Sequence, residues 1–221
     1  MKILSNKFYT CFLIFFLSFG NSIALAETKI KAESTASATE QISAPKKVVI
    51  DFQNALLDAM KQGESLSFQA RSKQLEAAIL KSHDVIKSLR TIVGSKQWKG
   101  FTEEQRAKLS KVFTKFIVST YAANFNEFAN ESFVFVSEHT TKKGNVIIRS
   151  IFEIPESKRK KVTFDYALKK SADNWKIYNI AADGVSDLAT RRSEYRRILA
   201  KEDGFNSLIA IISKKIDNYA K

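Results

Sequence analysis

The hydrophobic periodicity of this 221-residue chain changes near Asn130, and this change limits the folds that the chain can adopt. Before Asn130 the apolar residues recur every three or four positions, which is the spacing of one face of an α-helix. After it they alternate with polar residues, as in a strand with one buried face. Helical spacing returns after Ser186. A run of strands flanked by helices in the sequence predicts an α+β domain.

Three helices are predicted before Asn130. The first follows residues 48–60 and the second residues 68–93, where Gly94 ends the pattern. Thr102, with Gln105 three residues later, is a capping-box signature that marks the start of a third, longer helix. The apolar stripe of this third helix consists of Leu109, Val112, Phe113, Phe116, Ile117, Tyr121, Phe125 and Phe128.

Four strands are predicted after Asn130, and the short links between them favour an antiparallel meander with one face toward water. They lie around residues 133–135, 146–154, 162–168 and 175–182. Ser186 can cap a further helix, and Gly204 separates that helix from a last one. The expected architecture is a four-stranded antiparallel sheet packed against N-terminal and C-terminal helices.

The N-terminus has the composition of an export signal. Two lysines precede an apolar stretch over residues 8–20, and Ala24 and Ala26 supply small residues for cleavage. We therefore predict a signal peptide over residues 1–26, an uncleaved membrane anchor being the alternative. Residues 27–47 lack aromatic side chains and are predicted to be a disordered tether. Residues 48–221 form the predicted domain.

The predicted mature chain is basic and free of cysteine. The one cysteine, Cys11, lies inside the predicted signal peptide, so the domain has to be held by its core and not by disulfides. Cleavage removes two lysines and no acidic residue, which lowers the formal net charge from +13 to +11. A basic exported protein encounters anionic lipid head groups more readily than nucleic acid. Nucleic acid is therefore not an expected partner.

No catalytic, metal or cofactor motif stands out in the chain. It has no thiol in the mature part, no H-E-x-x-H, G-x-S-x-G or G-x-G-x-x-G motif and no phosphate loop. Neither His83 nor His139 has a second histidine or cysteine at metal-ligand spacing. For His83 we expect a packed structural role. The sequence predicts a protein that is not an enzyme and needs no cofactor or metal.

The predicted mature chain keeps most of the 17 phenylalanines of the sequence, which is generous for one domain of this size. It indicates either a well-filled core or an interior that leaves an apolar pocket for a ligand. A lipid with two acyl chains has roughly 30 methylenes, and sheltering them is worth on the order of 25 kcal/mol. A carrier needs no bond chemistry, because membrane and pocket solvate acyl chains about equally.

We predict that such a pocket is lined by the third helix and by one face of the sheet. The predicted lining residues are Phe113, Phe116, Tyr121, Phe133, Ile148, Phe152, Phe164, Tyr166 and Ile177. Two basic clusters are candidates for the pocket rim or for docking to a partner. Their predicted residues are Lys160 and Lys161 in the turn before the third strand, and Arg191 and Arg192 on the penultimate helix.

From about Arg71 to Ile216 the chain resembles the MlaC, or toluene-tolerance, family of periplasmic lipid-binding proteins. The residues that carry the resemblance follow one another in family order. They are Trp98, Phe101-Thr102-Glu103-Glu104-Gln105-Arg106, Thr120-Tyr121-Ala122, Trp175-Lys176-Ile177-Tyr178-Asn179-Ile180, Asp183-Gly184-Val185-Ser186, Arg192-Ser193-Glu194-Tyr195, Gly204 and Leu208-Ile209. Residues 122–125, 131–133 and 186–195 look more like the hopanoid-associated branch, HpnM.

The resemblance implies an NTF2-like fold that encloses an apolar lipid pocket. It further implies a carrier that moves phospholipid, or hopanoid, between the inner and outer membranes. The implied partners are an inner-membrane ABC transporter with an MCE domain and an outer-membrane lipoprotein complex. Two positions depart from the family pattern: His83-Asp84 replaces a usual Phe-Asp pair, and Asn179 replaces a usual Asp. The rival hypotheses are a periplasmic protein-interaction module with a filled core and, more remotely, a hydrolase.

Overall fold

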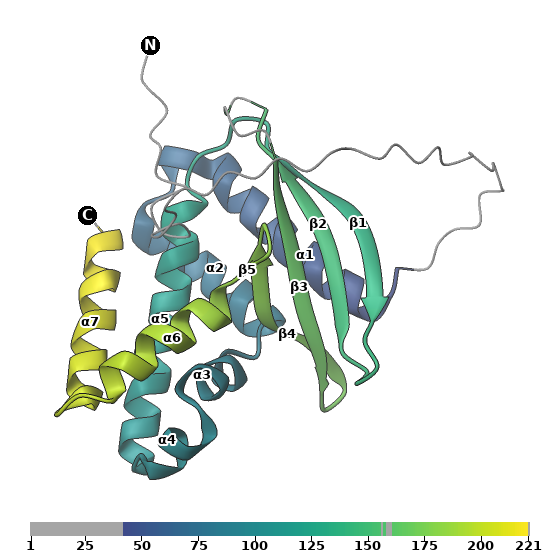
Figure 1. The fold of residues 1–221 in the computed structure, drawn as a ribbon. Coiled ribbons are helices and arrows are strands. Elements are labelled where there is room, and N and C mark those ends of the chain that lie inside the picture. Colours follow the sequence, from purple (N-terminus) through teal and green to yellow (C-terminus); the bar gives the residue numbers. More distant parts are fainter. Residues whose placement is uncertain (1–41, 156, 158–160, 221) are drawn as a thin grey trace, which may run out of the picture.

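The computed structural model describes residues 42–155, 157 and 161–220, so the predicted signal peptide lies outside the described residues. The described chain passes through helices, one antiparallel sheet and two further helices, which confirms the α+β class (Figure 1). Before the sheet lie α1 (Ala44–Gln62), the 3-10 turn η2 (Gly63–Ser65), α2 (Phe68–Ser82), α3 (Val85–Val93), α4 (Ser95–Gly100) and α5 (Glu103–Asn124). Within the described part, no helix combines the length and the apolar character needed to cross a membrane.

The sheet has five strands, so the prediction of four was one strand short. In chain order and in spatial order they are β1 (Ser132–Thr140), β2 (Val146–Glu153), β3 (Lys161–Ser171), β4 (Asn174–Ala182) and β5 (Val185–Ser186). Ala182 pairs with Val185 across the two-residue turn Asp183-Gly184, and both turn residues have positive φ, 47° and 80°. Asp-Gly favours this kind of tight hairpin turn, so the sequence carried a local signal for the fifth strand that the prediction did not use.

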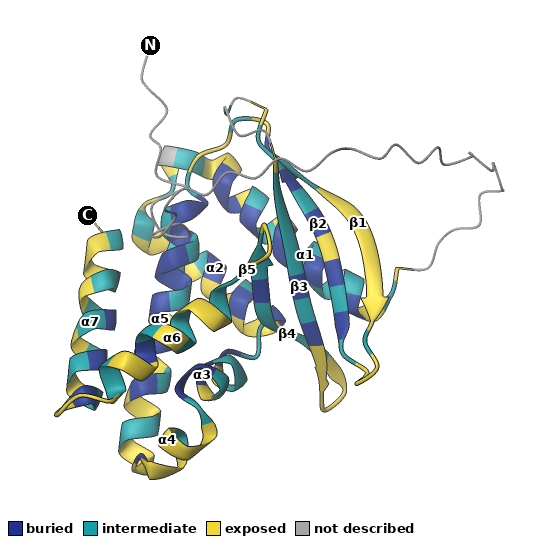
Figure 2. Cartoon of the chain, in the orientation of Figure 1, coloured by how far each residue is buried: buried dark blue, intermediate teal, exposed yellow. Residues whose placement is uncertain are grey.

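The sheet has one buried and one wet face, as the alternation predicts. Along β2, Val146, Ile148 and Phe152 are buried, whereas Arg149 is exposed. Figure 2 shows buried and exposed segments following one another along this strand. Arg149 forms an ion pair of 2.7 Å with Asp165, its neighbour on β3. The register of β2 and β3 therefore places one apolar set against the helices and one polar set in solvent.

The predicted helix over residues 68–93 is in fact two helices, α2 and α3. His83 leaves the helical conformation with φ −105° and ψ 148°, and the Asp84 side chain caps α3 by accepting from Lys87 N at 3.0 Å. The backbone N–H of Asp84 donates to the carbonyl of Ile177 in β4 at 2.8 Å. This bond to a distant strand ends α2, and helical periodicity alone did not predict it.

The folded domain starts four residues before the predicted boundary at Val48. Ser43 caps α1, because its hydroxyl accepts from Lys46 N at 3.2 Å, and Pro45 lies in the first turn, where a missing N–H breaks no helical bond. Residues 44–47 are therefore helical and not part of a tether. The rest of the predicted tether, residues 27–41, lies outside the described residues.

Two helices follow the sheet, α6 (Asp187–Leu199) and α7 (Gly204–Tyr219). Ser186 caps α6 as predicted, and Thr102 and Gln105 form the predicted capping box of α5. The helices α1, α2, α3 and α6 contact the sheet, while α5 packs behind α2 and α3 and carries α7 on its other side. The sheet and helices enclose an apolar interior, an arrangement that is consistent with the predicted NTF2-like fold.

Candidate functional site

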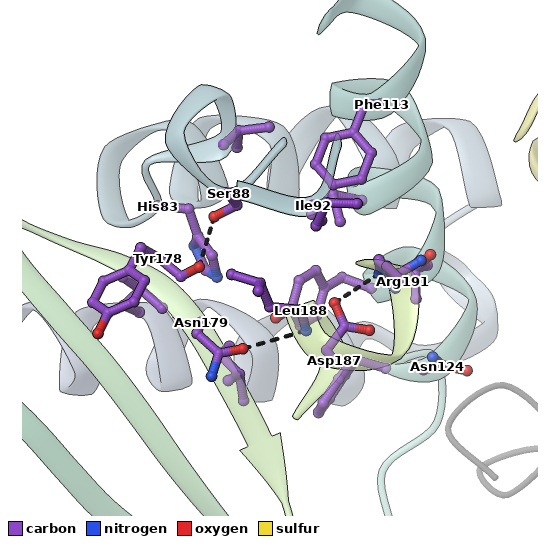
Figure 3. Close-up of a pocket in the computed structure, with 17 residues that line it drawn as sticks. His83, Ser88, Ile92, Phe113, Asn124, Tyr178, Asn179, Asp187, Leu188 and Arg191 are labelled. Atoms are coloured by element: carbon purple, nitrogen blue, oxygen red, sulfur yellow. Dashed lines mark hydrogen bonds and ion pairs between the residues drawn. The ribbon is translucent and has the colours of Figure 1, made fainter. Parts of the chain in front are cut away.

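A cavity of about 70 Å³ lies among β4, α3, α5 and α6 (Figure 3). Its apolar lining residues are Val85, Ile92, Phe113, Ile117, Tyr121, Phe125, Ile177, Ile180 and Leu188. Its polar lining residues are His83, Ser88, Thr120, Asn124, Tyr178, Asn179, Asp187 and Arg191. A pocket with mostly apolar walls and a few directed polar groups is the usual form of a small-molecule site.

Hydrogen bonds from polar side chains hold three elements of this wall together, namely α3, β4 and α6. The hydroxyl of Ser88 in α3 donates to the backbone carbonyl of Tyr178 in β4 at 2.7 Å. The side-chain oxygen of Asn179 accepts from the Ser186 hydroxyl at 3.0 Å and from Leu188 N at 3.3 Å (Figure 3). Asn179 thus joins β4 to the first turn of α6, although the family pattern has Asp at this position.

His83 lies at the end of α2, where the break before α3 turns its side chain toward the cavity (Figure 3). Its ring packs edge-on against Phe52 at 4.7 Å and Tyr121 at 5.9 Å between centroids. Nδ1 lies 2.8 Å from the Ser82 hydroxyl, and Nε2 is buried with no hydrogen-bond partner among the described residues. Burial lowers the pKa of His83 to about 3, so the imidazole is neutral at physiological pH.

Arg191 reaches the cavity from α6. Its Nε donates to Asp187 Oδ2 at 2.7 Å, and its guanidinium carbon lies 4.6 Å from the centroid of the Phe116 ring. Burial disfavours the charged guanidinium, but Asp187 together with Tyr195 and Tyr219 more than offsets it, so the pKa of Arg191 is raised. The cation is therefore kept charged inside an apolar wall, where it is 12% exposed.

A second cavity of about 40 Å³ lies on the other side of Tyr121, toward α1 and β3. It is lined by Phe52, Leu56, Tyr121, Asn124, Phe125, Phe164, Tyr166 and Ile180. Four of these residues, Tyr121, Asn124, Phe125 and Ile180, also line the first cavity. They are the wall that divides one interior space into two.

A wider groove of about 600 Å³ lies outside this interior, between α1, α2 and the β3–β4 turn. Its walls carry charged residues that are partly paired with one another, such as Lys47 with Asp51 at 2.9 Å and Lys81 with Asp51 at 3.6 Å. The groove is the larger space, but its charged walls suit water better than an apolar ligand.

Five of the nine predicted lining residues line the two cavities. Phe113 and Ile177 line the first, Phe164 and Tyr166 line the second, and Tyr121 lines both. The other four, Phe116, Phe133, Ile148 and Phe152, line neither. Phe133 and Phe152 instead pack against each other at 4.6 Å between ring centroids, and Ile148 is buried on the inner face of β2. Phe116 packs against Arg191 and the ring of Tyr219.

Of the four predicted rim residues, Arg191 is at the first cavity. Arg192, the next residue of α6, is half-buried and lines neither cavity. Lys161 begins β3, where it forms an ion pair of 3.1 Å with Glu153. Lys160 lies outside the described residues. The two predicted basic clusters are therefore not brought together at one rim by the described residues.

Most of the polar residues of the first cavity were not predicted from the sequence. Ser88, Asn124 and Asp187 lie near apolar positions of their helices, and nothing in their spacing distinguishes them from solvent-facing residues. For Asn179 and His83 the sequence did contain a signal of a special role, because both residues depart from the family pattern. Both contribute side chains to the cavity wall.

Two comparisons with known proteins bear on this site. A family model described as MlaC protein matches residues 51–214, which is most of the described domain. No curated protein matches the chain. The solved structure of the phospholipid-binding protein from Ralstonia solanacearum, in complex with a phospholipid, is similar with a TM-score of 0.67. It is 20% identical, and the match covers 80% of this chain and 96% of that one, which establishes the fold.

Proposed function

This chain belongs to the MlaC family, and on that premise we propose that it is a periplasmic lipid carrier. It shelters the acyl chains of a phospholipid, or the apolar body of a hopanoid, and moves the lipid between the inner and outer membranes without altering it. The observation that carries this proposal is the apolar cavity between β4 and α6. The phospholipid in the Ralstonia solanacearum protein supports the same ligand class here.

The two cavities have to merge before an acyl chain fits. A cavity of about 150 Å³ holds one benzene in another protein, and about 70 and 40 Å³ in separate spaces hold less. Their common wall is Tyr121, Asn124, Phe125 and Ile180. Rotation of the Tyr121 and Phe125 rings would join the spaces into one channel from α6 to β3. This step is required because roughly 30 methylenes cannot be left in water.

The helix α6 is the element that can open most cheaply. All of its residues are described, and Tyr195 is the one that is fully buried, whereas α5 buries eight. Its first two turns contribute Asp187, Leu188 and Arg191 to the cavity wall. An outward movement of α6 would therefore widen the cavity at a smaller loss of buried apolar surface than a movement of α5.

We assign lipid contact to the nine residues predicted from the sequence, and five of these already line the two cavities. Phe116, Phe133, Ile148 and Phe152 would be reached only by a ligand that extends further beneath the sheet.

Arg191 is the proposed contact for an anionic head group or partner carboxylate, with Arg192, Lys160 and Lys161 as docking residues. The proposed docking partners are an inner-membrane ABC transporter with an MCE domain and an outer-membrane lipoprotein complex. Export requires cleavage of the predicted signal peptide near Ala26.

Native mass spectrometry of the protein purified gently from its host tests the proposal. We expect one lipid to co-purify with each chain. Leu188→Trp, which fills the first cavity from α6, should lower lipid occupancy at least fivefold, because a buried indole takes the volume that the lipid needs. The matched control is Leu80→Trp, since Leu80 is 50% exposed on α2 and lines neither cavity.

The rival functions give different outcomes in the same experiment. Protein without lipid, with a protein partner retained instead, would support the interaction module and overturn the carrier. Turnover of an ester substrate by the purified chain would support the hydrolase. Equal loss of lipid in both tryptophan variants would show that the cavity near Leu188 is not the lipid site.

A further inference from the structure

One nitrogen atom at the cavity wall has no hydrogen-bond partner. Among the described residues, the buried side-chain atoms without a partner are Gln53 Nε2, Ser72 Oγ and His83 Nε2. His83 is the one of these that lines the first cavity. A buried polar atom that stays unpaired costs on the order of 1–3 kcal/mol, so its persistence in a folded chain asks for an explanation.

The neighbouring bonds determine which proton the His83 ring carries. The hydroxyl of Ser82 lies 2.6 Å from the carbonyl of Ala78, and because a hydroxyl has one hydrogen, that hydrogen is donated there. The contact of 2.8 Å between Ser82 Oγ and His83 Nδ1 is then a bond donated by Nδ1–H. In a neutral imidazole this leaves Nε2 as a lone-pair acceptor.

Protonation and water do not satisfy this acceptor. The ring stays neutral because the apolar surroundings disfavour the imidazolium. Phe52 and Tyr121 pack against the ring, and Nε2 is covered closely enough that a water molecule does not reach it. Tyr121 is also part of the wall between the two cavities, so a ligand that merges them moves a residue that covers His83.

We propose that the cavity selects a lipid whose buried part carries a hydroxyl or amino group, and that His83 Nε2 accepts the hydrogen bond from that group. An unsubstituted acyl chain has no donor and would leave Nε2 unpaired, whereas a chain or ring system with a hydroxyl would pair it. The inference rests on the proposed carrier function and narrows its ligand class. His83 thereby acts as a specificity residue at the point where the two cavities meet.

A competition between matched lipids tests the inference. The probes are two phosphatidylglycerols that are identical except for a hydroxyl group on one acyl chain, placed at mid-chain in one experiment and near the chain end in another. Native mass spectrometry reports the ratio of the two loaded forms. For the wild type we expect at least one of the hydroxylated lipids to be preferred by about tenfold, which corresponds to one ordinary net hydrogen bond.

His83→Phe should remove this preference and still bind the plain lipid, because it keeps a ring of similar shape and removes the acceptor. His139→Phe is the matched control, since His139 is exposed near the end of β1 and should leave the preference unchanged. Nitrogen-15 labelling of the two histidines adds a direct readout. The Nε2 resonance of His83 should shift when the hydroxylated lipid binds and stay in place with the plain one.

Three outcomes would overturn the inference. They are equal loading of plain and hydroxylated lipids by the wild type, a preference that survives His83→Phe, and an Nε2 resonance that does not respond to the hydroxyl. In each of these cases the carrier function still stands, because lipid is bound. If neither lipid binds to the wild type, the carrier function itself fails, and the inference fails with it.

Discussion

The interior of the protein has two halves that are built differently. Beneath β1 and β2, Phe133 and Phe152 pack ring against ring with centroids 4.6 Å apart, and neither lines a cavity. Beneath β4 and α6, which we call the cavity half, the wall contains a cavity, a guanidinium that is only 12% exposed and an imidazole nitrogen with no partner among the described residues. Burying polar or charged groups costs free energy, so a core that serves stability alone is not expected to contain them. On the proposed function, stability and ligand binding are therefore concentrated in different halves of the interior.

The largest expected effect comes from a matched pair of substitutions, one in each half. Phe152→Ala should destabilise the fold by about 3–5 kcal/mol, because it removes a side chain that packs on every side. Phe113→Ala, at a ring that already borders a cavity, should cost about 1 kcal/mol less. Urea unfolding measures both. Equal costs would mean that the two halves are packed alike.

Arg191→Met should destabilise the fold by about 2–3 kcal/mol, because it leaves the carboxylate of Asp187 without its charged partner. Arg191→Lys keeps the charge but loses the planar contact with Phe116, so an intermediate loss is expected. The measurement is the urea midpoint of each variant. If Arg191→Met is as stable as the wild type, the ion pair between Arg191 and Asp187 contributes nothing to the stability of the fold.

His83 should make the stability of the cavity half depend on pH. Its pKa is lowered to about 3 in the folded chain, against about 6.5 when unfolded, so the unfolded chain takes up the proton first as the pH falls. Stability is therefore lost between about pH 6.5 and pH 3. From pH 6.5 to pH 5 the wild type should lose about 2 kcal/mol more than His83→Phe. Parallel pH curves for the two proteins would contradict the assignment of a buried neutral imidazole.

The smallest effect is expected on the outer face of the sheet. Asp165→Asn breaks the ion pair with Arg149, which is solvated, and exposed pairs of this kind contribute little. We expect the urea midpoint and lipid occupancy to stay within measurement error of the wild-type values. A clear loss of lipid would mean that the outer face, and not the cavity half, contacts the ligand.

Features that depend on neighbouring residues were predictable from the sequence. The capping box of Thr102 and Gln105, the cap at Ser186 and the alternation along β2 are local patterns, and all are present in the structure. The break between α2 and α3 was not predicted, because Asp84 N is bonded to the carbonyl of Ile177 in β4, more than ninety residues away. The short β5 was missed although its turn, Asp183-Gly184, is a local signal.

The candidate site was predictable only in part, for a related reason. Alternation identifies the inward face of each strand, but it does not say which inward residues meet other side chains and which border open space. Phe152 and Ile177 are inward residues of their strands, yet the first is packed among rings and the second lines a cavity. The difference depends on the helix that faces each strand.

By itself the sequence determined the α+β class, most helix starts and the buried face of the sheet, because periodicity and capping act over a few residues. It also determined the large apolar content from which a cavity can be built. The tertiary structure alone decided that the open space lies beneath α6, that Arg191 is paired there and that His83 Nε2 is left unpaired. These features arise where α3, α5, α6 and β4 meet, and such meetings depend on packing between residues far apart in the chain.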